Sequence, residues 1–111
     1  MLDKNLNIID DLIMELMGNR WKLIIIKNLM DGTKRFGELK QQIGDITQKV
    51  LTENLKILEK HGLLVREVYA QIPPRVDYTL TTVGESLKPI IDALVDWAMD
   101  YKSKIMGLQQ A

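Results

Sequence analysis

The sequence predicts a single, mainly α-helical domain with one small β-hairpin. Apolar residues recur at helical spacing in several separate stretches, and glycines follow four of these stretches where a helix would end. Residues 76–80 alternate strictly between apolar and polar side chains, which is the pattern of a half-buried strand. A chain of 111 residues, 46% of them hydrophobic, has room for one core and for no second domain.

The glycines divide the chain into the expected elements. Three helices are expected first, over residues 6–17, 20–30 and 36–42. Asn19 is positioned to cap the second helix, and a brief strand at 33–35 precedes the third. Thr47 is a favourable N-cap residue and opens a longer helix to about Lys60, with one apolar and one polar face.

A hairpin and a final helix are expected next. Residues 64–71 are rich in β-forming side chains, and a rigid loop at 72–75 joins them to the strand at 76–80. The motif beginning at Thr82 matches a capping box and predicts one long helix over residues 82–104, whose first turns Pro89 should bend. Helix, helix, short helix, turn, helix, hairpin, helix is the order of a winged helix-turn-helix domain.

Charge is distributed unevenly, although the formal net charge is zero. Residues 20–75 hold eleven Lys and Arg against six acidic residues, whereas residues 1–19 and 76–111 are acidic overall. A basic middle between acidic ends is typical of a DNA-facing unit attached to a separate partner-facing surface. Chance segregation of the charges is the alternative.

Several function classes lack support in the sequence. No apolar run reaches the ~20 residues needed to span a bilayer and no secretory signal is evident, so we expect a cytoplasmic protein without a membrane partner. Cysteine is absent and His61 is the single histidine, so we expect no disulfide, thiol-based redox sensing, metal site or cofactor. Neither a Ser-His-Asp arrangement nor a glycine-rich phosphate loop is present, so we assign no catalytic residue and expect no enzyme.

Four motifs stand in a fixed order along the chain: GNRWK at 18–22, RFGEL at 35–39, ITQKVLT at 46–52 and PPRVDY at 73–78, the last followed by Leu80 and Thr81. Together they closely resemble the HxlR family of bacterial regulators, over roughly residues 6–101. The resemblance implies homodimers that bind operator DNA and dimerise through the N- and C-terminal helices. Some members sense oxidants or electrophiles through a cysteine before the tryptophan-bearing helix. Ile8 stands at that position here, so thiol sensing is not implied.

The helix that follows Thr47 is the candidate for reading DNA, because the major groove of B-DNA accepts an α-helix. Gln48 can pair with adenine, and Lys49 with guanine or phosphate. Thr52 can contact a thymine methyl group or a phosphate, and Lys56 can contact the phosphate backbone. The helix N-terminus at Thr47 adds a favourable dipole for phosphate. An ordinary solvated helix face is the alternative.

Three further cations are candidate DNA contacts. Arg75 follows two prolines at the hairpin tip, from which a projecting guanidinium would suit a narrow minor groove. The alternative for Arg75 is a solvated side chain on a stiff turn. Lys34 and Arg35, beside the short helix, are predicted to contact phosphates.

The terminal helices, residues 6–17 and 82–104, carry more apolar surface than the DNA-binding core at 20–80 can cover. Pairing two copies would bury that surface, and the predicted contacts are Leu6, Ile9, Ile13, Leu94, Trp97 and Tyr101. Two-fold symmetry then predicts a pseudo-palindromic operator whose half-sites lie one helical turn, roughly 34 Å, or a multiple apart. For the tryptophans, core or dimer packing is favoured over a ligand site, although a flexible apolar dimer groove could admit a hydrophobic effector.

The sequence therefore predicts a sequence-specific DNA-binding transcriptional regulator of the HxlR type, with double-stranded DNA, a second copy and a small-molecule effector as partners. The alternative is a winged-helix protein-interaction module without DNA binding, which the zero net charge favours.

Overall fold

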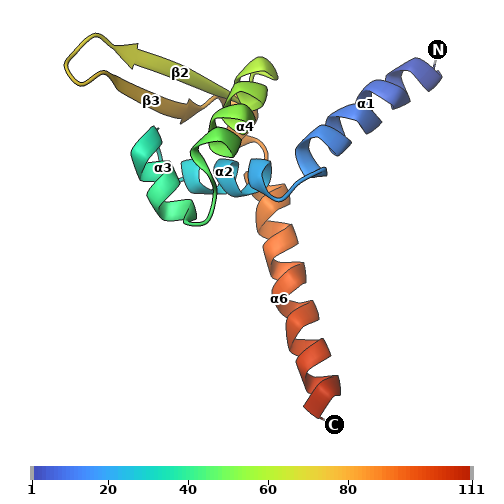
Figure 1. Cartoon of the computed structure of the whole chain (residues 1–111). Helices are drawn as coiled ribbons and strands as arrows, with labels where there is room; N and C mark the ends of the chain where they lie inside the picture. The colour runs from blue at the N-terminus through green and yellow to red at the C-terminus, as the bar shows by residue number, and fades with distance from the viewer. Residues whose placement is uncertain (1, 111) are drawn as a thin grey trace.

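The computed structural model describes the backbone of residues 2–110 and the side chains of residues 8–107. Over this part of the chain, helices and a small sheet follow one another in the predicted order (Figure 1). The elements are α1 (Leu2–Met17), α2 (Trp21–Leu29), β1 (Lys34–Arg35), α3 (Phe36–Ile43), α4 (Gln48–Lys60), β2 (Leu64–Tyr69), β3 (Arg75–Leu80), α5 (Thr82–Glu85) and α6 (Lys88–Gln110). A mainly α-helical, winged helix-turn-helix fold is confirmed.

The core lies where α2 and α4 pack against each other and against the sheet. The apolar face predicted for α4 is buried through Leu51, Leu55 and Leu58, and α2 contributes Ile25 and Ile26. Each of these side chains is at most 1% exposed, so their burial fixes which way α4 faces.

Polar side chains fix where the helices begin. The Thr47 hydroxyl accepts a hydrogen bond from the amide of Val50 at 3.2 Å, which confirms Thr47 as the N-cap of α4. The Asn19 side chain accepts from the Trp21 amide at 2.9 Å before α2. It also contacts the buried side chain of Asn54 at 3.4 Å, which ties the turn before α2 to α4.

The three strands form an antiparallel sheet in the order β1-β3-β2. The short strand predicted before α3 is present, with Arg35 opposite Asp77. The hairpin register places Leu64 opposite Leu80 and Tyr69 opposite Arg75. The rigid loop is therefore shifted towards the N-terminus, to residues 70–74, and Arg75 is the first residue of β3.

The prediction of one continuous helix from Thr82 is wrong. The chain forms α5, leaves the helix at Ser86 and Leu87, and re-enters a helix as α6. Pro89 explains the interruption, because it has no amide to donate to the carbonyl of Glu85 and is tolerated only in a first helical turn. The capping residue also differs: Thr81, not Thr82, accepts from the Gly84 amide at 3.1 Å.

The first and last long helices, α1 and α6, leave the body in different directions (Figure 1). The radius of gyration is 16.7 Å, whereas a compact chain of this length would have about 13 Å. Large apolar side chains on these two helices are exposed. They are Ile8, Ile9, Leu12, Ile13, Met14 and Met17 on α1, and Ile90, Leu94, Trp97, Met99, Tyr101 and Met106 on α6.

Gly84 permits a close approach that the hairpin depends on. A Cβ atom at this position would collide with the backbone carbonyl of Leu63, whereas one at Gly37, in α3, would meet open space. We expect Gly84→Ala to lower the free energy of unfolding by about 1–3 kcal/mol or more. Gly37→Ala, the control, should raise it by up to about 1 kcal/mol. Urea unfolding of both variants tests this, and equal effects of the two substitutions would contradict it.

Candidate nucleic-acid interface

The outer face of α4 carries the residues predicted to read DNA. Gln48, Lys49 and Lys56 are exposed and Thr52 is half-buried. Among the described side chains, neither Lys49 nor Lys56 lies within 4.0 Å of a carboxylate oxygen. Two ammonium groups on one exposed helix face are therefore available to phosphates or base edges.

The first turn of α4 adds oriented backbone donors to these cations. Thr47 satisfies the amides of Val50, through its hydroxyl, and of Leu51, through its carbonyl. The amides of Gln48 and Lys49 have no intrahelical acceptor at this end of a helix. Such amides, together with the helix dipole, favour an anionic group.

Thr52 can make fewer contacts with DNA than a threonine with a free hydroxyl group. Its hydroxyl donates to the carbonyl of Gln48, one turn earlier in α4, at 2.8 Å. The hydroxyl proton is thus already used inside the helix. The methyl group remains for contact with a thymine methyl, and the oxygen remains as an acceptor.

Arg75 does not project from the hairpin tip as predicted. Its Nε and Nη2 atoms donate to the two carboxylate oxygens of Asp77, each at 2.9 Å. Its guanidinium carbon also lies 5.0 Å from the centre of the Tyr69 ring. Arg75 and Asp77 meet because alternate residues of a strand share one face. The carboxylate of Asp77 is only 6% exposed, so its charge needs a hydrogen-bonded partner.

The charges of this pair stabilise each other. The hydrogen bond from Arg75 holds the pKa of Asp77 below its ordinary value, against the opposing effect of burial. In return, the hydrogen bond to Asp77 raises the pKa of Arg75. Burial, followed by the charge of Glu67, raises the pKa of Tyr69, the ring beneath the guanidinium. The wing, which is the β2–β3 hairpin, therefore has a charged hydrogen-bonded pair next to its tip.

The two cations beside α3 differ from each other. The Lys34 side chain is only 11% exposed and its ammonium lies 3.9 Å from Asp31, so it is partly committed within the protein. Arg35 is exposed, and its amide donates to the Glu38 carboxylate at 2.9 Å. Of the two, Arg35 is the better positioned to meet a phosphate.

Residues not anticipated from the sequence also border this surface. A groove of about 230 Å³ lies between the start of α3 and the hairpin loop, and its lining includes Arg35, Gln71 and Pro73. Ile72, at the centre of that loop, is completely exposed. The sequence feature that indicates this exposure is an isoleucine in a short turn beside two prolines, because an apolar side chain at such a place has no core to pack into.

Most side chains predicted for the dimer interface are exposed on the two protruding helices. Ile9 and Ile13 are exposed on α1, and Leu94 is exposed on α6. Trp97 is 64% exposed and stacks on Tyr101, with 5.2 Å between the ring centres. Leu6 lies outside residues 8–107, whose side chains the structure describes.

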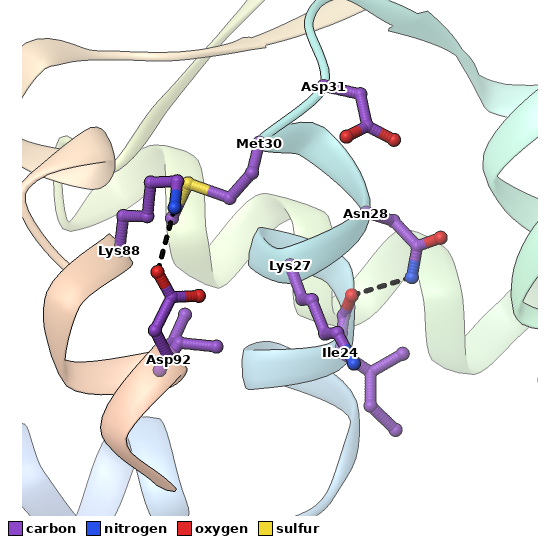
Figure 2. A pocket seen from close by; sticks show the side chains of 8 residues that line it. Ile24, Lys27, Asn28, Met30, Asp31, Lys88 and Asp92 are labelled. Carbon is purple, nitrogen blue, oxygen red and sulfur yellow. Dashed lines mark hydrogen bonds and ion pairs between the residues drawn. The ribbon is translucent and has the colours of Figure 1, made fainter. Parts of the chain in front are cut away.

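A cavity of about 470 Å³ lies between α2 and the start of α6 (Figure 2). Lys88 pairs with Asp92 at 2.7 Å on one side, and Asn28 donates to the carbonyl of Ile24 at 2.8 Å on the other. A more apolar groove shares Ile24 with this cavity and continues along α6. The core helix α2 and the last long helix, α6, therefore meet at a hollow with both apolar and charged walls.

Among the described residues, no group of three or more His, Cys, Asp or Glu side chains is arranged to hold a metal ion. None of the helices within residues 2–110 is both long and apolar enough to cross a bilayer.

Comparison with known proteins gives consistent matches. The model of the HxlR-like helix-turn-helix family matches residues 16–106. The HTH-type transcriptional regulator YdeP of Bacillus subtilis is 43% identical over 88% of this chain and 77% of its own. The structure of the transcriptional regulator YtfH of Salmonella typhimurium superposes with a TM-score of 0.80 at 31% identity, covering 92% and 90% of the two chains. Reduced YodB of B. subtilis gives 0.70 at 41%, covering 79% and 86%.

The Arg75–Asp77 pair predicts a pH dependence confined to acid. Because the folded pKa of Asp77 is lowered, its contribution to stability is complete above the ordinary aspartate value of about 4 and is lost as the pH falls through the lowered pKa. Carboxyl-carbon NMR should find Asp77 titrating below the usual range, and Arg75→Gln should return it towards that range. An unchanged Asp77 titration in Arg75→Gln would contradict the pairing.

Proposed function

The chain belongs to the HxlR-like helix-turn-helix family and is a DNA-binding transcriptional regulator, and we propose that it acts as a homodimer that reads a pseudo-palindromic operator through α4. The observation that supports α4 most is its outward face, where Lys49 and Lys56 are exposed and unpaired among the described side chains. The apolar face of the same helix is buried, so the polar face is held towards the solvent.

In this proposal, the N-terminal half of α4 enters the major groove. Gln48 and Lys49 read base edges, Thr52 contacts a thymine methyl, and Lys56 contacts a phosphate. The first-turn amides and Thr47 lie against a second phosphate. Arg35 supplies a flanking phosphate contact, whereas the pairing of Lys34 with Asp31 favours a smaller role for Lys34.

The homodimer is supported by the exposed apolar surface of α1 and α6. A single copy leaves Ile9, Ile13, Leu94, Trp97 and Tyr101 in water. Contiguous apolar surface of this kind marks an interaction site. A second copy is the occupant we propose, because two-fold pairing would cover the surfaces of both chains and present two α4 helices to one face of DNA.

A small-molecule effector forms part of the proposal. Among the structural neighbours, HypR is described as a redox regulator and YodB has been seen with bound quinone. This chain has no cysteine, so a thiol adduct or disulfide is unavailable to it. The cavity between α2 and α6 supports a non-covalent ligand instead, since it lies where the reading half joins a dimer helix.

The protein-interaction alternative is not favoured, because relatives across most of the chain are transcriptional regulators. Since that family consists of regulators, the proposed function is DNA binding and not catalysis. Its DNA partner would place the protein in the cytoplasm.

Lys49→Ala tests the role of α4. Loss of one phosphate or base contact should weaken operator binding by about 1–3 kcal/mol and reduce the salt dependence of binding by about one counterion. Lys60→Ala, at the other end of α4, is the matched control and should bind like the wild type. Fluorescence anisotropy across a salt series, with a duplex selected from random DNA by the wild-type protein, measures both. Identical affinities for all three proteins would remove Lys49 from the interface.

Trp97→Ala combined with Leu94→Ser tests the dimer. Because these side chains lie on a protruding helix and outside the core, the double variant should keep its helical circular dichroism but sediment as a monomer. Val65→Ser, which removes an exposed apolar side chain from β2, is the control and should remain dimeric. A wild type that sediments as a monomer, or a double variant that stays dimeric, would refute the proposed interface.

A further inference from the structure

The hairpin tip has a composition that its position in solvent does not explain. The loop at 70–74 reads AQIPP and carries no charged side chain. Ile72 lies at its centre with its side chain 100% exposed. Pro73 and Pro74 follow immediately and hold the backbone behind it with fixed φ angles. The tip therefore presents a stiff, neutral, apolar point.

The cation that follows the loop in sequence does not change this character. The guanidinium of Arg75 is turned back onto Asp77 and over the ring of Tyr69. Both oxygens of that carboxylate accept from it, so releasing Arg75 would leave a largely buried carboxylate without its partner. Arg75 thus braces the base of the tip, while Ile72 forms its end.

The hairpin is also long enough to reach an adjacent groove of DNA. The hairpin follows α4 after the turn at Gly62, and each of its strands has six residues. At about 3.4 Å per residue, the hairpin reaches roughly 20 Å. Along B-DNA, a major groove and the adjacent minor groove are half a helical turn apart, about 17 Å. Figure 1 shows the hairpin extending away from α1, on the side of the body that carries α3.

We propose that Ile72 is an apolar wedge that enters the minor groove of the operator beside the major groove occupied by α4. Minor-groove proteins insert side chains such as Ile, Leu and Pro between base steps, partly unstack them and bend the duplex. Gln71 lines the protein groove between the hairpin tip and the start of α3. Its side-chain amide can form hydrogen bonds with base edges on the floor of the DNA minor groove. The occupied step is a flexible pyrimidine–purine step, where unstacking is cheapest.

This inference rests on the proposed function, and it assigns the wing a different chemistry from that of α4. A lysine or arginine that contacts a phosphate releases counterions from the DNA when the protein binds. Removing such a cation therefore lowers both the affinity and the salt dependence of binding. An aliphatic wedge releases no counterion. Removing it should therefore lower the affinity and the DNA bend and leave the salt dependence unchanged.

The test compares Ile72→Ala with wild type on the duplex that the wild type selects from random DNA. Removing most of an aliphatic side chain that is buried on binding should weaken affinity about tenfold. We expect an unchanged salt slope in anisotropy and a smaller bend by energy transfer between dyes at the duplex ends. Ile72→Leu should restore affinity and bend, and Val65→Ala, an exposed aliphatic truncation on β2, should bind like the wild type.

The possible outcomes distinguish a failure of the Ile72 wedge from a failure of the proposed DNA-binding function. If the wild type selects an operator but Ile72→Ala binds and bends it equally well, the wedge is wrong and the regulator stands. A loss of affinity with a reduced salt slope, or an equal loss in Val65→Ala, would also overturn the wedge. If the wild type selects no DNA at all, the wedge and the operator-reading homodimer fail together. If Ile72→Ala binds DNA normally but fails to capture a protein bound by the wild type, the tip serves a protein partner instead.

Discussion

Burial of one face of α4 is the constraint on which the rest of the structure depends. Leu51, Leu55 and Leu58 are held between α2 and the sheet, so the helix cannot rotate without exposing its apolar side chains. The face that carries Lys49 and Lys56 is consequently held outwards by packing on the opposite side of the helix. Thr47 fixes the start of the helix, which also fixes the position of the unsatisfied first-turn amides. Core packing therefore sets the orientation of this helix face, and the Thr47 cap sets where the helix begins.

The wing shows how a second, smaller interaction changes the chemistry of a surface. The hydrogen bonds to Asp77 occupy the guanidinium of Arg75, the first cation after the loop. The same pairing joins two residues of β3 and, through Tyr69, spans the hairpin. A braced hairpin loses less conformational entropy on binding than a flexible one. In the proposed complex, the wing and α4 approach the DNA by different physical means: the wing presents an apolar tip and α4 presents a charged helix face.

Local patterns predicted most of this arrangement, and the failures have physical causes. Periodicity and capping were sufficient for α4, because Thr47 and the leucine stripe act within a few residues. The break at Ser86 and Leu87 does not follow from local patterns, because a proline such as Pro89 can either bend a helix or lie in the first turn of a new one. The direction of Arg75 was missed although its strand spacing to Asp77 was visible, because the burial of Asp77 depends on Arg35 and β1, which are distant in sequence. The apolar stripe of α6 does not predict the exposure of Trp97, because the same pattern is typical of a helix that packs against the core.

Hydroxyl-radical footprinting of the wild-type protein, on a duplex that it selects from random DNA, tests the operator-reading dimer most directly. Two copies that each insert α4 should protect two blocks of the duplex, related by approximate two-fold symmetry and centred about 10 base pairs, or a multiple of that, apart. The backbone of the adjacent minor grooves should be protected as well. A single protected block, or uniform protection along the duplex, would contradict a symmetric dimer that reads DNA through α4.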